Sequence, residues 1–315
     1  MSLRLLIARG LLASMFLSST FVINRYLGVS GGDWLWTGAL RFIWVSIMLG
    51  LWFFLRDRRM LKRGILEFFR NWVWITAGTL WAIAYSIVCF SASYVPGWVT
   101  AAAWQTTIIA TPIALACFGR RIPMKGFLLL FLLIAGVVLT QVGKAGEEQF
   151  STVTITLGVA AILVAAFVWP VANQLVKECV AGSHGMIPPA PQGIAETSIG
   201  RVFLMSIGTL PIFLLAVLAF APKMPTSDQY FGTMAIAVSS GVVGMSLFLW
   251  ARQDAKTPLQ TSAVDAMQSG QIIFSILGES IFFSGRWPDG WEIVGLLIVV
   301  LTIVLFTFSE TRKMR

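Results

Sequence analysis

The sequence predicts an all-α membrane protein of ten transmembrane helices, built as two inverted five-helix repeats with both termini in the cytoplasm. Three observations support this prediction: the composition, the apolar runs and the placement of the basic residues. Hydrophobic residues make up 57% of the 315 positions and charged residues only 12%, whereas soluble domains have about 45–50% apolar and roughly 25% charged residues. Because so little charge cannot cover a surface in water, most of the chain is expected to lie in lipid.

Ten apolar runs are long enough to cross a bilayer, whose hydrocarbon core of about 30 Å needs roughly 20 helical residues. Short connections with turn-forming residues separate the runs, such as Gly31-Gly32-Asp33 and Trp287-Pro288-Asp289-Gly290. The expected spans are residues 5–27, 36–55, 71–93, 97–119, 124–142, 153–175, 199–220, 229–251, 258–283 and 290–309.

The first span is predicted to be a membrane helix rather than a cleaved signal peptide. Arg4 and Arg9 lead into an apolar stretch that continues to Asn24 without an Ala-x-Ala-like cleavage site. Its N-terminus is placed in the cytoplasm, and the later spans then alternate in direction.

The basic residues follow this alternation. Most of the 23 Lys and Arg residues fall in segments expected on the cytoplasmic side, and only Lys144, Lys223 and Arg286 fall in segments expected outside. Cytoplasmic loops of membrane proteins are enriched in Lys and Arg, so the distribution supports the ten-helix count. The formal net charge of +9 is therefore explained by topology, and no nucleic-acid partner is expected.

A dense basic run extends from Arg56 to Arg70, after the second span. Two interpretations are open for it. It is either a loop that fixes the topology or a short interfacial helix on anionic lipid.

An internal repeat is suggested by residues that recur in the second half. Arg41 and Gln105 are matched by Arg201 and Asp265 about 160 residues later. Because each half has an odd number of helices, equivalent helices would cross in opposite directions, as in secondary transporters.

The chain is expected to divide into four parts. Residues 1–142 form the first repeat, and residues 143–177 form an outer loop and the sixth helix, which opens the second repeat. Residues 178–198 form a flexible cytoplasmic linker rich in Gly and Pro, and residues 199–315 form the last four helices and a cytoplasmic tail.

Several local sequences resemble the drug/metabolite transporter superfamily, and the resemblance covers nearly the whole chain. They are Asn24 near the end of the first span, Arg41 in the second, Gly278-Glu279, Gly285-Arg286-Trp287-Pro288, and the segments 197–201 and 263–270. The ten-helix members of that superfamily carry two EamA-like five-helix repeats, and the chain is most similar to the branch labelled putative multidrug-resistance efflux transporters. The resemblance implies a multi-pass transporter of the bacterial cell (inner) membrane. The proton-binding Glu in helix 1 of the four-helix small drug pumps has no counterpart in the first span.

Polar and aromatic side chains inside the spans are the candidates for a substrate or proton site, because such groups in lipid tend to face a cavity. The candidates are Asp265, Gln268, Gln105, Trp104, Asn24, Arg41, Trp81, Tyr85, Trp169, Asn173 and Glu279. The four aromatic side chains among them would offer apolar and cation–π surface to an organic molecule.

Asp265 is the leading candidate. It lies roughly 12 Å into the ninth span, where desolvation favours a neutral carboxyl, so it could bind a proton or a substrate cation. It could instead form a structural salt bridge with Arg41 or Arg201. For Glu279, pairing with Arg286 is the alternative, and Arg41 itself could be a structural residue or a gate. Some of the tryptophans are expected to be interfacial anchors.

No catalytic, metal or cofactor motif is apparent. The only histidine, His184, lies in the linker, and neither His-x-x-Glu-His nor Gly-x-Ser-x-Gly occurs. Cys89, Cys117 and Cys179 are far apart and are expected to be small core side chains. An enzyme is therefore not expected, and no cofactor is predicted.

The leading functional hypothesis is a secondary transporter that exports small organic solutes or drugs by alternating access, with or without proton coupling. Uptake of a metabolite by the same fold, as a carrier or a facilitator, is one alternative. Translocation of a lipid or lipid-linked substrate is another. The spans 124–142 and 290–309 have little polar content, so they are expected at the periphery, where a homodimer could form in place of a monomer.

Overall fold

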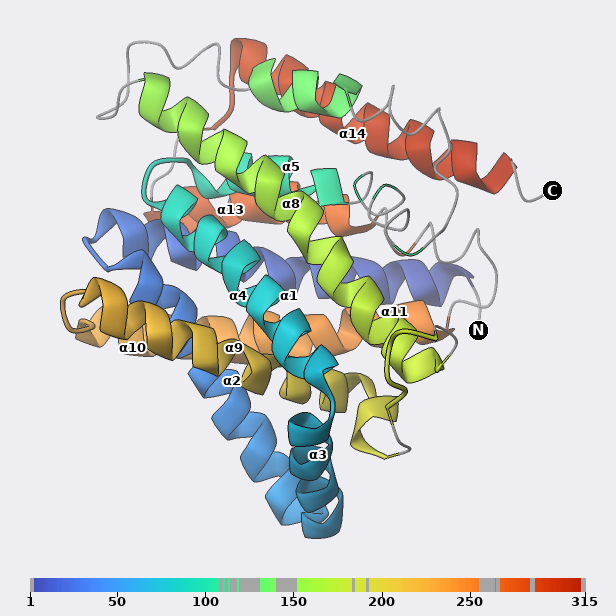
Figure 1. The fold of residues 1–315 in the computed structure, drawn as a ribbon. Helices are drawn as coiled ribbons and strands as arrows, with labels where there is room; N and C mark the ends of the chain where they lie inside the picture. Colours follow the sequence, from blue (N-terminus) through green and yellow to red (C-terminus); the bar gives the residue numbers. More distant parts are fainter. Residues whose placement is uncertain are drawn as a thin grey trace.

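The computed structural model describes residues 3–107, 110, 113, 118, 131–139, 152–182, 185–190, 193–254, 264, 267–283 and 287–312. All regular secondary structure among these residues is helical (Figure 1). Asp265 and parts of the predicted spans 97–119, 124–142 and 258–283 lie outside the described residues.

Six helices in the described part of the chain are long and apolar enough to cross a bilayer. They are α1 (Leu3–Val29), α2 (Trp34–Arg56), α4 (Trp72–Ala92), α8 (Thr152–Ala181), α9 (Ser198–Phe220) and the continuous run of α10 (Ser227–Ile236), η2 (Ala237–Gly244) and α11 (Met245–Asp254). All six coincide with predicted spans, so the prediction of an all-α, multi-pass membrane protein is confirmed. The count of ten helices and their orientation stay predictions.

Further described helices lie within the other four predicted spans. They are α5 (Gly97–Trp104), a helical stretch at 131–139, η3 (Met267–Ser269) followed by α13 (Gly270–Phe283), and α14 (Gly290–Arg312).

The basic run after α2 is a helix, α3 (Arg58–Arg70). Asp57 separates the two helices, because its backbone is extended and its carboxylate accepts hydrogen bonds from the backbone nitrogens of Arg59 and Met60 at 2.9 and 3.0 Å. Phe68 is buried on one side of α3, while the basic side chains are exposed. The basic run therefore forms a helix, as one of the two interpretations of the sequence expected, and not a loop.

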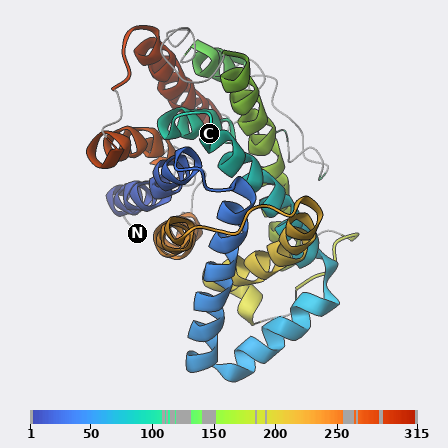
Figure 2. The same cartoon turned by 90° about the vertical axis from the view of Figure 1, so that its left-hand side faces the viewer.

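The helices pack in two overlapping groups. α4 lies against α8 and α9, and α9 also lies against α2; these four surround the largest described cluster of buried apolar side chains. α1 lies between α13 and the α10–η2–α11 helix, as Figure 2 shows. The N-terminal end of α1 and the C-terminal end of α14 lie on the same side of the molecule, at the right of Figure 1.

Two glycines let α4 and α9 cross closely. A Cβ atom added to Gly78 would overlap the backbone of Gly208, and one added to Gly208 would overlap the carbonyl oxygen of Trp74. Small residues at such crossings allow membrane helices to approach each other backbone to backbone. The first and second halves of the sequence therefore meet at this crossing without intervening side chains.

The connection after α8 is held against the helices where the structure describes it. The backbone nitrogen of Ala190 donates to the carbonyl oxygen of Cys179 at 2.9 Å. Asn71 Nδ2, at the start of α4, donates to the carbonyl oxygen of Pro188 at 3.3 Å. The segment predicted as a flexible linker is thus bonded to the start of α4 and the end of α8 at these points.

Candidate functional site

Three tryptophans from three helices form a stacked cluster. The ring of Trp81 in α4 lies parallel to that of Trp169 in α8, with centroids 4.7 Å apart and an interplanar angle of 2°. Trp104, at the end of α5, meets Trp169 edge-on at 5.4 Å. Aromatic pairs of this kind contribute about 0.5–1.5 kcal/mol beyond the burial of their surface. The stack therefore fixes α4, α5 and α8 against one another.

Phe42 extends this stack to α2 and α9. Its ring centroid lies 6.3 Å from Trp81, 5.4 Å from Tyr85 and 5.9 Å from Phe213. Nothing in the sequence distinguishes Phe42 from the other 22 of the 23 phenylalanines, because an apolar residue in an apolar span carries no signal of its own. We call Phe42, Trp81, Tyr85, Trp104 and Trp169 the aromatic cluster.

Arg41 is a buried cation at the edge of the aromatic cluster. Its side chain is only 9% exposed, and its guanidinium carbon lies 4.0 Å from the centroid of the Tyr85 ring. Arg41 Nη2 donates to Ser240 Oγ at 3.2 Å. Asn24 positions the phenol from the other side, with Nδ2 and Oδ1 at 3.0 and 3.3 Å from Tyr85 Oη.

Ser240 lies in η2, a π-helical segment in the middle of the α10–η2–α11 span. Its hydroxyl also accepts a hydrogen bond from Thr20 Oγ1 at 2.6 Å, and the neighbouring Ser239 hydroxyl lies 2.7 Å from Ser19 Oγ. Single π-helical turns frequently occur at functional sites. Sequence reasoning missed Ser240, although Ser239-Ser240-Gly241 is a small, polar run inside an apolar span.

Several buried donors near this site have no hydrogen-bond partner among the described residues. They are Arg41 Nε and the indole nitrogens of Trp81, Trp36 and Trp44. Whereas Arg9 pairs with Asp254 at 2.7 Å, Arg41 forms no ion pair with a described residue. A buried charge without a counter-charge costs several kcal/mol. Among the described residues, therefore, the positive charge of Arg41 has no counter-charge, and these N–H groups have no hydrogen-bond acceptor.

The structure brings six of the predicted site residues together and gives others local partners. The six are Asn24, Arg41, Trp81, Tyr85, Trp104 and Trp169. Gln105 is buried, and its Nε2 donates to the carbonyl oxygen of Ala101 at 3.0 Å. Asn173 Nδ2 donates to the carbonyl oxygen of Trp169 at 3.0 Å. Gln268 is half-buried in η3.

Glu279 binds the N-terminus of α5. Its side chain is buried, and Oε1 accepts a hydrogen bond from the backbone nitrogen of Gly97 at 2.5 Å. The first N–H groups of a helix have no partner inside the helix, and a negative charge there is also favoured by the helix dipole. Arg286, its partner in the alternative interpretation, lies outside the described residues.

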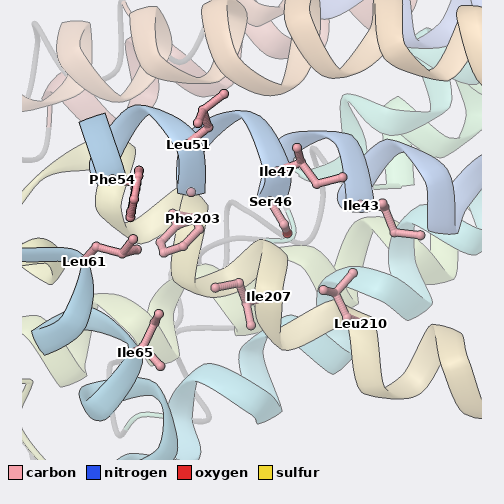
Figure 3. Close-up of a pocket in the computed structure, with 11 residues that line it drawn as sticks. Ile43, Ser46, Ile47, Leu51, Phe54, Leu61, Ile65, Phe203, Ile207 and Leu210 are labelled. Atoms are coloured by element: carbon pink, nitrogen blue, oxygen red, sulfur yellow. The ribbon is translucent and has the colours of Figure 1, made fainter. Parts of the chain in front are cut away.

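A groove of about 520 Å³ lies between α2, α3 and α9 (Figure 3). Its lining is apolar apart from Ser46, and it contains none of the predicted site residues. The lining residues are Ile43, Ser46, Ile47, Gly50, Leu51, Phe54, Leu61, Ile65, Phe203, Ile207 and Leu210.

Comparison with known proteins gives one family and several relatives. Residues 4–312 match the family model EmrE, described as "Putative multidrug resistance efflux transporter". The chain is 31% identical to "Uncharacterized protein YjlA" of Bacillus subtilis (strain 168), across 96% of this chain and 95% of that protein. It is 28% identical to "Uncharacterized 42.1 kDa protein in intracellular alkaline protease 3'region" of Shouchella clausii, across 87% and 72% of the two chains. A crystal structure with 14% sequence identity has a TM-score of 0.59 and covers 97% of this chain and 98% of its own, a likeness of fold alone.

Proposed function

Because this chain belongs to the EmrE family of putative multidrug resistance efflux transporters, we propose that it is a secondary transporter that exports small organic molecules by alternating access. In this proposal, ten helices form two inverted five-helix repeats in the cell (inner) membrane, with both termini in the cytoplasm. The substrate binds against the aromatic cluster, midway between the repeats.

The stack of Trp81 on Trp169 is the observation that carries this proposal. α4 belongs to the first proposed repeat and α8 to the second, so the stacked rings join the two halves. Substrate sites of secondary transporters lie where their repeats meet, near the middle of the bilayer. Aromatic faces with a few polar groups beside them suit flat organic molecules. They bind such molecules through a large apolar contact surface rather than through one specific group.

Replacing Trp169 tests the site. Trp169→Ala is expected to weaken the apparent affinity for exported compounds roughly three- to tenfold, since it removes ring contacts of about 0.5–1.5 kcal/mol each. Trp169→Phe keeps an aromatic face, so it should lose less. The measurement is export from proteoliposomes of a panel of aromatic cations, neutral molecules and anions. Trp291→Ala, an exposed tryptophan on α14, is the matched control. A folded Trp169→Ala variant that exports every compound at the wild-type rate would contradict the proposed site.

Proton exchange through Asp265 is the proposed energy source. A carboxyl within the ninth predicted span would exchange a proton for substrate as it is exposed to each side in turn. Asp265→Asn is expected to abolish substrate-dependent proton movement, followed with a pH dye in proteoliposomes. Asp228→Asn changes an exposed acid and should behave as wild type. Transport without proton movement, equal in wild type and Asp265→Asn, would exclude coupling and leave a facilitator.

A further inference from the structure

We propose that Arg41 binds an anionic group of the substrate, so that the transporter prefers aromatic organic anions. This inference rests on the proposed transport function and narrows its substrate class. It follows from the chemistry of one buried cation, its neighbours and the rings that adjoin it.

The guanidinium of Arg41 is buried but incompletely bonded. Nη2 donates to Ser240 Oγ, while Nε has no partner among the described residues. The guanidinium carbon lies 4.0 Å from the centroid of the Tyr85 ring, a cation–π contact that does not satisfy Nε. Arginine presents five N–H donors in a planar fork that matches a carboxylate or a sulfonate. An anion at that fork would satisfy Nε and neutralise the charge at once.

The described residues do not supply this counter-charge, because the ion pair that they form joins Arg9 to Asp254 and does not include Arg41. Ser240 already accepts hydrogen bonds from both Arg41 and Thr20. The buried carboxylate of Glu279 binds the backbone nitrogen of Gly97, and that of Glu67 accepts from Asn71 and Trp74. Among the described residues, therefore, no acid is placed to pair with Arg41. Asp265 lies outside the described residues.

The aromatic cluster adjoins the cation and would hold the body of the same substrate. Tyr85, beneath the guanidinium, meets Phe42, and Phe42 meets Trp81 of the tryptophan stack. A molecule with a ring and a carboxylate a bond or two apart would place its charge at Arg41 and its ring against this cluster. An aromatic cation of the same shape would instead bring two positive charges together in a low dielectric, where repulsion is strong.

Three compounds of matched shape test this preference: phenylacetate, phenylacetamide and phenethylamine. Binding to the purified full-length protein is measured by calorimetry, and export is measured in proteoliposomes. Phenylacetate is expected to bind at least tenfold more tightly than the other two. Arg41→Gln should lower phenylacetate affinity to the level of the amide and leave amide binding unchanged. Arg41→Lys keeps a positive charge and should retain part of the preference. The control is Arg201→Gln, the predicted repeat counterpart, whose side chain donates to the carbonyl oxygens of Ala195 and Glu196.

The possible results separate this inference from the proposed function. Tighter binding of the amine or amide, or an equal effect of Arg41→Gln on all three compounds, would overturn the anion preference and leave the transporter proposal standing. Loss of the preference in Asp265→Asn, as in Arg41→Gln, would also overturn it, because Arg41 would then act only through Asp265. If neither these compounds nor the wider panel is transported by the wild type, the proposed function itself fails.

An independent observation concerns the groove between α2, α3 and α9. We infer that it holds an acyl chain of an anionic phospholipid whose phosphate lies on Arg58. The groove is apolar and about 520 Å³ in volume (Figure 3). The guanidinium carbon of Arg58 lies 4.3 Å from the ring centroid of Phe54, which lines the groove. A cation therefore lies beside an apolar groove, which is the pairing that an anionic lipid requires.

The amphipathic helix α3 explains why this pairing arises. Leu61 and Ile65 of α3 line the groove, while Lys62 on the same helix is exposed beside Arg58. An interfacial helix buries its apolar face and keeps Lys and Arg at the level of the headgroups. The chain thus has apolar and basic surfaces at the two depths where a phospholipid has its tail and its phosphate.

Thermal unfolding in mixed micelles tests the lipid. Phosphatidylglycerol is expected to raise the Tm of the full-length protein more than phosphatidylcholine does, and Arg58→Gln should remove that difference. Lys223→Gln, which alters an exposed lysine outside the groove, should keep it. Equal stabilisation by the two lipids, or an unchanged difference in Arg58→Gln, would overturn the inference. Equal stabilisation by glycerol phosphate would overturn the part that assigns an acyl chain to the groove.

Discussion

Glu279 and Arg41 are both charged side chains buried in the protein, yet their surroundings differ. The carboxylate of Glu279 accepts a hydrogen bond from Gly97 at the start of α5, so its charge has a structural use. Arg41 donates to Ser240 and lies over the rings of Tyr85 and Phe42, while its Nε has no partner among the described residues. The hydrogen bond of Glu279 stabilises the fold. A buried donor without a partner, as at Arg41 Nε among the described residues, is rare in proteins and is consistent with a ligand site.

Glu279→Gln should destabilise the protein without changing substrate preference. The amide oxygen can still accept from Gly97, but the charge at the helix N-terminus is lost, so we expect a loss of roughly 1–2 kcal/mol in the free energy of unfolding. Thermal unfolding in detergent measures it. Glu196→Gln, which changes an exposed side chain, is the control. Equal stability of the two variants would show that the Glu279 charge is not needed at α5.

At the scale of whole helices, the close crossing of α4 and α9 and the π-helical η2 are the features that sequence patterns do not show. Gly78 and Gly208 allow the crossing because neither has a Cβ atom. η2 places Ser240 where it accepts from both α1 and α2, through Thr20 and Arg41. Both features join helices from the first half of the chain to helices from the second, so they bear on how the halves move relative to each other.

Gly208→Ala should separate α4 from α9. The new methyl group would overlap the Trp74 carbonyl oxygen, and overpacking of this kind costs about 1–3 kcal/mol. Thermal unfolding and transport are measured together, and both should decline. Gly270→Ala at the start of α13 is the matched control, because its Cβ would meet only side chains, at 3.5 Å or more. A wild-type Tm for Gly208→Ala would mean that the crossing adjusts at little cost.

For the whole molecule, the orientation of the helices in the membrane is the central prediction. The ends of α1 and α14 lie on one side (Figure 1), which agrees with an even number of crossings. Met186 in the predicted cytoplasmic connection and Met224 in a predicted outer loop are both strongly exposed. Their positions allow the alternation to be tested directly in cells.

Met224→Cys should react with an impermeant maleimide in intact spheroplasts, and Met186→Cys only after the membrane is opened. The wild-type chain is the control, because Cys89 and Cys179, the cysteines that the structure describes, are buried. Labelling of both variants from outside would contradict the predicted alternation and with it the ten-helix count.

Much of the site was predictable from residue type. Eleven polar and aromatic side chains are candidates because such groups are conspicuous in apolar spans. Six of the eleven lie together: Asn24, Arg41, Trp81, Tyr85, Trp104 and Trp169. Phe42 and Ser240 were missed, since their roles depend on what faces them across helices. The same limitation applies to Glu279, whose contact with Gly97 joins residues far apart in the chain.

The lipid environment, the helical class, six of the spans and the family could be predicted from the sequence, because a helix that crosses a bilayer requires a long apolar run that is visible in the sequence. Which side chains are neighbours follows from the tertiary structure: the stack of Trp81 on Trp169, the crossing of Gly78 with Gly208, and the absence of an acceptor for Arg41 Nε among the described residues. In a membrane, apolar surface does not specify which helices pair, since lipid tails are as apolar as leucine. Pairing depends on shape and on single hydrogen bonds between distant residues, and these appear only when the helices are packed.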